Sequence, residues 1–164
     1  MRRYPLVVLL AVAGVITPAT AAHAQLLGSL SINAPPSAEL GSAPTGSPTL
    51  SGSLGPVQVT DTRSVALSWS ATVSSTSFTG PGPTAIPGGS VTYISGAATE
   101  SSGLVTPVPG PALGVTLEGP KTAFSGTVLV VGGNSVTWNP TIRVALPEGA
   151  LAGSYSGTIT HSVS

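Results

Sequence analysis

Apolar and polar residues alternate most regularly in the stretch 57–73, VQVTDTRSVALSWSATV. A polar break, in which Asp61 and Arg63 are expected to pair around a turn, divides this stretch into two runs. Leu67 and Trp69 lie at the same parity of the second run. A period of two residues is typical of half-buried β-strands, whose successive side chains point to opposite faces. We therefore expect both residues on the buried face of one strand, covered by a second sheet.

A further alternating run follows the glycine-rich segment 132–134. This segment, GGN, suits a hairpin turn because its residues tolerate a positive φ. The return strand, 136–146, has Trp138 at its apolar parity. Pro140 cannot donate a backbone hydrogen bond, so we expect this strand to lie at an edge or to be bulged there.

The last predicted strand covers residues 155–163. It places Tyr155 and His161 on one face and serine and threonine residues on the other. A continuous apolar run at 127–131 predicts a strand buried on both faces. Shorter strands are predicted at 26–33, 91–94 and 115–117.

Two stretches rich in turn-forming residues are predicted as loops. One covers 100–111, and the other, 35–55, is rich in Pro, Gly, Ser and Thr. The composition of 35–55 suits either a flexible linker or a long loop strapped over the domain. Leu40, Leu50 and Leu54 recur within it and favour a loop that is at least partly packed.

The composition agrees with many short strands joined by turns. Only 6% of the 164 residues are charged and 41% are apolar, and the chain holds 21 glycines and 16 prolines. Alternating apolar residues with so many turn formers favour an all-β fold over disorder. We predict an Ig-like antiparallel β-sandwich of roughly eight strands, formed by residues 25–164 as one domain.

The N-terminus has the features of an export signal. Arg2 and Arg3 precede an apolar run at 6–16 that is too short to span a bilayer comfortably. The sequence AHA at 22–24 has the small-x-small form of a cleavage site. We predict a cleavable signal peptide at 1–24 and a secreted, extracellular protein.

The predicted mature chain is weakly acidic. It contains three basic and five acidic residues, a net charge of −2 with His161 neutral. Nucleic acid is not an expected partner, because no basic patch is present to neutralise phosphates. The chain has no cysteine for a disulfide or a lipid anchor, and we expect no membrane span after residue 25. If the protein stays at the cell surface, it has to be held there non-covalently.

Residues suited to catalysis are few. The predicted mature chain has one histidine, one aspartate and no cysteine, which leaves no metal cluster and no nucleophile motif for a Ser-His-Asp arrangement. Its four glutamates fall mainly in Gly/Pro-rich loops without neighbouring aromatic platforms, unlike the paired carboxylates of glycosidases. We predict a non-enzymatic protein without a metal or cofactor.

Two segments resemble the WxL domain of Gram-positive cell-surface proteins, and the resemblance spans roughly 28–164. The first segment is V-T-D-T-R at 59–63, followed by the strand that contains Trp69. The second is the C-terminal G-S-Y-S-G-T-I-T-H-S-V. The family's first motif, Trp-x-Leu, reads Trp69-Ser70-Ala71 here.

The second family motif is Y-x-x-x-L-T-W-x-L. Its tyrosine, first leucine, threonine and last leucine positions are taken here by Tyr155, Ile159, Thr160 and Val163. His161 stands where the family has tryptophan.

The resemblance implies a surface protein that associates non-covalently with the bacterial cell wall, with peptidoglycan as its ligand. It marks Trp69, Tyr155 and His161 as candidate ligand-binding residues. Trp69 and Trp138 would serve as platforms for sugar rings if they were exposed. Both lie at the apolar parity of their strands, so core packing is the better prediction. For Tyr155 and His161, too, the alternative to ligand binding is packing in the core.

A second class of function remains open, in which the protein is a structural or adhesive surface subunit. Such a subunit would assemble through β-strand edges with itself or with a protein partner, and the extended apolar segment 26–33 could complete a neighbour's sheet. A strand donor should form concentration-dependent oligomers that vanish when 25–36 is deleted. A wall binder should stay monomeric and pellet with insoluble wall.

Overall fold

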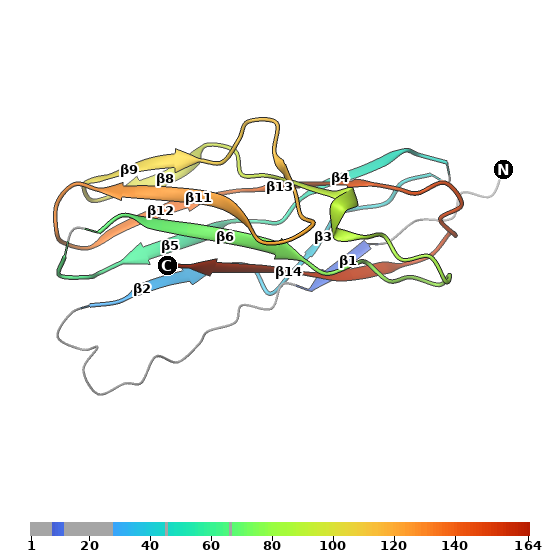
Figure 1. Ribbon diagram of the computed structural model, residues 1–164, viewed down its shortest axis with the longest axis horizontal. Coiled ribbons are helices and arrows are strands. Elements are labelled where there is room, and N and C mark those ends of the chain that lie inside the picture. Colours follow the sequence, from blue (N-terminus) through green and yellow to red (C-terminus); the bar gives the residue numbers. More distant parts are fainter. Residues whose placement is uncertain (1–7, 12–27, 45, 66) are drawn as a thin grey trace.

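A computed structural model describes residues 8–11, 28–44, 46–65 and 67–164, which form a sandwich of β-sheets (Figure 1). The strands of this part of the chain are β1 (Val8–Ala11), β2 (Leu30–Asn33), β3 (Ser37–Glu39), β4 (Thr49–Ser53), β5 (Val57–Asp61), β6 (Trp69–Ser75), β7 (Val91–Ile94), β8 (Ala98–Ser102), β9 (Val105–Pro109), β10 (Val115–Thr116), β11 (Lys121–Val128), β12 (Asn134–Trp138), β13 (Thr141–Ala145) and β14 (Tyr155–Val163), and a 3₁₀-helix, η2, covers Gly88–Ser90.

The strands form two layers. One layer is a six-stranded sheet in the order β3-β1-β14-β6-β11-β9. The other consists of two four-stranded sheets, β10-β7-β13-β4 and β2-β5-β12-β8. Neighbouring strands pair antiparallel, apart from the parallel pair of β1 and β14. The predicted all-β class and antiparallel sandwich are confirmed.

The second layer is divided because its long strands are interrupted midway. Strand β12 ends at Trp138, and β13 begins at Thr141, beyond Pro140. Pro140 has no N–H to donate to the ladder, but its carbonyl still accepts a hydrogen bond from the Leu54 N–H, at 3.0 Å. The ladder is therefore broken at Pro140, but the predicted edge position is wrong, because β12 and β13 each lie between two other strands of their sheets. Short gaps also separate β4 from β5 and β7 from β8, so the described residues contain more strands than the eight expected.

An apolar core lies beneath each four-stranded sheet. The core beneath β7 and β13 includes Tyr93, Ile142 and Ile159, and the core beneath β5 and β12 includes Trp69 and Trp138. All five side chains are buried. Alternation in the sequence therefore identified the residues that the two layers bury against each other.

The last strand follows the prediction closely. Strand β14 covers Tyr155–Val163, and Tyr155, Ile159 and His161 are buried on one face. It pairs with β6 through residues 159–163. Its first half instead lies beside residues 76–79, where Thr79 and Ser156 exchange backbone hydrogen bonds.

The prediction for Leu67 was wrong. Strand β6 begins only at Trp69, and the Leu67 side chain is 52% exposed in the loop after β5. A hydrogen bond of 2.8 Å from Arg63 Nη2 to the Leu67 carbonyl holds this part of the loop. Parity alone does not reveal such a contact between a side chain and the backbone.

Residues 127–131 also depart from the prediction. Strand β11 ends at Val128, and the following apolar residues 129–131 are exposed. The glycine turn at 132–133 does not close a hairpin, because β11 pairs with β6 and β9 whereas β12 pairs with β5 and β8. The chain crosses here from one layer to the other.

Both stretches expected as loops contain strands. Within 35–55 lie β3 and β4, and Leu40, Leu50 and Leu54 are buried, which agrees with the packed alternative. Strands β8 and β9 occupy most of 100–111 and are sheet edges. Both are largely exposed, so they lack the alternation that marks a half-buried strand.

The predicted signal peptide, 1–24, lies outside the described residues apart from Val8–Ala11. These four residues form β1, between β14 and β3 (Figure 1). The predicted cleavage site at 22–24 and residues 26 and 27 of the predicted first strand also lie outside the described residues.

We expect Gly126→Ala to destabilise the sandwich by about 1–3 kcal/mol, as overpacked cores do. Gly126 of β11 pairs with Trp69 of β6, and a Cβ at Gly126 would lie 2.3 Å from Cε2 of the Trp69 indole. Gly119→Ala is the matched control, because a Cβ there meets no atom within 4 Å. Urea unfolding of the two variants measures the difference, and equal midpoints would contradict this packing.

Candidate functional site

The three candidate ligand-binding residues lie inside the sandwich. Trp69 at the start of β6, Tyr155 at the start of β14 and His161 near its end are only 2%, 1% and 3% exposed. The alternative prediction for these residues, packing in the core, is confirmed. No ring face of these residues is open to a sugar, so any effect on ligand binding has to be indirect.

A buried chain of hydrogen bonds connects His161 to Trp138. The Trp138 Nε1–H donates to the Tyr93 hydroxyl at 2.9 Å, and Nε2 of His161 lies 3.1 Å from the same oxygen. Tyr93 belongs to one core and Trp138 to the other. The hydroxyl of Tyr93 therefore ties the two cores together.

The protonation states of this chain follow from burial. Burial lowers the pKa of His161 to about 4, so its imidazole is neutral at pH 7. Burial also raises the pKa of the Tyr93 hydroxyl, which keeps its proton. The Tyr93 oxygen can then accept from Trp138 and donate to Nε2 of His161. In the described part of the chain, Nδ1 of His161 has no hydrogen-bond partner.

Tyr93 was not among the candidates from the sequence. Its only signal is the parity of β7, in which Val91 and Tyr93 are buried and alternate with half-exposed residues. Nothing in the sequence reveals that its hydroxyl lies between residues 45 and 68 positions further along the chain.

Aromatic rings are stacked in the core beneath β5 and β12. The ring centroids of Phe124 and Trp138 are 4.7 Å apart with an interplanar angle of 20°, and those of Trp69 and Phe124 are 6.5 Å apart. Such offset stacks add to the free energy gained from burial. The aromatic groups of this site are thus used for packing.

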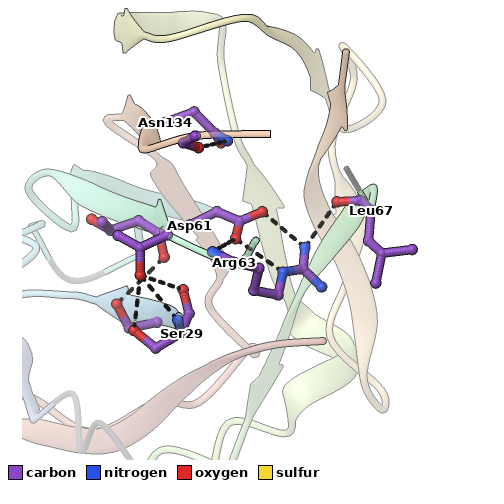
Figure 2. Close-up of polar contacts among 9 residues, drawn as sticks. Ser29, Asp61, Arg63, Leu67 and Asn134 are labelled. Atoms are coloured by element: carbon purple, nitrogen blue, oxygen red, sulfur yellow. Dashed lines mark hydrogen bonds and ion pairs between the residues drawn. The ribbon is translucent and has the colours of Figure 1, made fainter. Parts of the chain in front are cut away.

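The loop between β5 and β6 is organised by an ion pair (Figure 2). Asp61 Oδ2 lies 2.9 Å from Arg63 Nη2, and Asp61 Oδ1 accepts hydrogen bonds from the Arg63 backbone N–H and Nε. The guanidinium also reaches the Leu67 carbonyl. The expected pairing of Asp61 and Arg63 is confirmed.

The two charges perturb each other. Burial alone would raise the pKa of Asp61, but the hydrogen bonds and positive charge of Arg63 outweigh it and lower that pKa. The hydrogen bonding that the Arg63 guanidinium donates to Asp61 is also the main reason that the pKa of Arg63 is raised. Both groups stay ionised at neutral pH and hold the loop in place.

Exposed apolar side chains gather on the loops at this end of the sandwich. The Leu129 N–H donates to the Leu104 carbonyl at 2.9 Å, and β5 and β12 pair Asp61 with Asn134. These contacts place the loops after β5, β8 and β11 together (Figure 1). The large apolar residues on them are 47–61% exposed, and we call them the apolar end: Val65, Leu67, Leu104, Leu129, Val130 and Val131.

A pocket of about 370 Å³ lies at the opposite end. It is lined by the loop that leaves β3, including Ala43 and Pro44, and the loop that enters β14, including Leu146 and Leu151. Glu148 is the charged residue of its lining. The pocket is therefore mainly apolar, with a single carboxylate.

No family model matches this chain, and no curated protein matches it either. Among residues 8–11, 28–44, 46–65 and 67–164, no group of three or more His, Cys, Asp or Glu could hold a metal ion. The same part of the chain has no helix long and apolar enough to cross a membrane.

We expect the free energy of unfolding to fall between pH 6.5 and pH 4 because of His161. Its pKa is lower in the folded protein, so its contribution is fully present above the unfolded value near 6.5 and is lost as the pH falls to about 4. The lowering corresponds to roughly 3 kcal/mol. Urea unfolding at several pH values should show a shallower loss for His161→Gln. The control is Ser156→Gln, at an exposed position of the same strand, and equal pH profiles for the His161 variant and the unaltered protein would refute the assignment.

A double-mutant cycle tests the Asp61–Arg63 pair. We expect Asp61→Asn to cost about 2 kcal/mol, because it leaves the guanidinium without its buried carboxylate. Adding Arg63→Gln should cost less in that background than alone, with a coupling of about 1 kcal/mol. Arg143→Gln, at an exposed position of β13, serves as the control. Strictly additive losses of unfolding free energy would show that the pair contributes nothing.

Proposed function

We propose that this chain is an exported, non-catalytic cell-surface domain that associates non-covalently with the bacterial cell wall, with peptidoglycan as its ligand. The export signal and the WxL resemblance support this proposal. The contact surface is the apolar end and not the buried residues Trp69, Tyr155 and His161.

The apolar end is the observation that carries the proposal. Exposed clusters of large apolar side chains on a folded protein mark surfaces that contact another molecule. The loops that form this end carry a single charged residue, Arg63, which is paired with Asp61. The end can therefore cover the acetyl and alanine methyl groups of peptidoglycan without desolvating an unpaired charge.

The remaining groups favour binding over catalysis. The single histidine of the predicted mature chain is buried and neutral at pH 7, and Asp61 is held by Arg63. Neither residue has the access to solvent and substrate that a general acid or base needs.

Co-sedimentation with purified peptidoglycan sacculi tests the proposal. The protein should pellet saturably at moderate salt, because apolar contacts are not screened as charges are. The combined variant Leu129→Ser and Val131→Ser should lower the affinity by roughly tenfold or more, since two apolar side chains are lost from the contact. Leu113→Ser is the control, because Leu113 is 91% exposed on the loop between β9 and β10.

Two results would contradict the proposal. Protein that stays in the supernatant at every concentration would exclude direct wall binding. Equal losses for Leu113→Ser and the combined variant would remove the apolar end as the contact surface.

A second candidate function is a surface subunit that assembles through strand edges. The observation that favours it is the position of β1, a short strand from the predicted signal peptide that lies between two strands of the domain.

A further inference from the structure

Strand β1 occupies a slot in the six-stranded sheet. It pairs parallel with Tyr155–Thr158 of β14 on one side and antiparallel with Ser37–Glu39, the whole of β3, on the other. In the strand order, β1 is the only hydrogen-bonded neighbour of β3 among the described strands. The sheet thus reaches β3 only through β1 (Figure 1).

Cleavage of the predicted signal peptide would remove β1 and open this slot. The N–H groups of Ser156 and Thr158 point to residues 76–79, with partners at 2.9 Å. Because successive residues of a strand alternate in direction, the N–H groups of Tyr155 and Gly157 face β1. They would lose their partners, and open strand edges of this kind bind added strands.

The slot also borders the core beneath β7 and β13. Ala38 of β3 packs against this core, and Leu40 and Tyr155 belong to it. An open slot would expose part of this apolar layer to water, which is unfavourable. An apolar strand in the slot would cover the core and satisfy the backbone together.

The pocket described above lies at the open end of the slot. Its two walls are the loop that leaves β3 and the loop that enters β14, the same two strands that flank the slot. A chain that lies in the slot and continues past Tyr155 would reach this mainly apolar pocket. Slot and pocket together form one extended site.

We propose that the slot between β3 and β14 is a peptide-binding groove, which in the cleaved protein accepts an extended, apolar segment of at least four residues from a different protein. The groove deepens the second candidate function and does not depend on wall binding. In the uncleaved chain Val8–Ala11, VLLA, pairs as a strand in this position.

The length of the cleaved chain argues for a different protein as the donor. Cleavage after residue 24 would leave only residues 25–27 before Gly28. Gly28 is fixed at the other end of the sandwich, where a Cβ would lie 1.8 Å from the Thr62 carbonyl oxygen. Three residues are fewer than the four that β1 places in the slot, and Gly28, to which they are joined, lies at the end where β14 finishes. A second copy would offer the same three residues.

Amide hydrogen exchange tests the groove in three samples. These are the full chain produced without export, the chain cleaved by signal peptidase, and the cleaved chain with a synthetic VVLLAV peptide flanked by lysines. The Tyr155 and Gly157 amides should exchange slowly in the first sample, at least tenfold faster in the second, and slowly again in the third. The Ser156 amide is an internal control, because its bond to the Thr79 carbonyl persists in all three.

A peptide in which proline replaces the second leucine and the final valine should not restore protection, because proline donates no backbone hydrogen bond. Unchanged protection of Tyr155 and Gly157 after cleavage would overturn the proposal, since β3 would then have closed onto β14. Protection that returns with protein concentration alone would also overturn it, since a second copy would then fill the slot. Neither result affects sedimentation with sacculi, so the two proposals fail separately.

Discussion

The side chain of Trp138 connects the two cores of the sandwich. Its indole ring stacks on Phe124 in one core, and its N–H donates to Tyr93 in the other. The connection matters because the second layer is interrupted beside this residue, where Pro140 separates β12 from β13. The hydrogen bond from Trp138 to Tyr93 is a buried contact across that interruption.

This use of the aromatic residues determines where the protein can bind other molecules. Trp69, Tyr155 and His161, the candidates suggested by family resemblance, are all inside. With the interior closed, we propose that contacts with other molecules are made at the two ends of the sandwich. One end carries exposed leucines and valines on loops that are held by the Asp61–Arg63 pair, and the other carries the pocket and the slot of β1.

The sequence predicted elements whose two faces differ in burial. Strands β13 and β14 were found by alternation, because each has one face on a core. The edge strands β8 and β9 were missed because both their faces are largely exposed. The exposure of Leu129 depends on where β11 leaves its sheet, which is decided by pairing with distant strands.

The candidate site was harder to predict for the same reason. Burial of Trp69 and Tyr155 follows from parity, but the role of Tyr93 depends on partners in two other strands. The slot depends on a pairing between the N-terminal residues 8–11 and the C-terminal strand. Local patterns contain no information about such pairings.

We propose that the ends of the sandwich, and not its aromatic interior, contact other molecules. An NMR titration of the isotope-labelled protein with soluble peptidoglycan fragments tests it most directly. We expect shifts confined to the apolar end, in the amides of Leu104 and 129–131, with the indole N–H signals of Trp69 and Trp138 unchanged. Shifts centred on those indoles and on the His161 ring, with the loop amides unaffected, would contradict it.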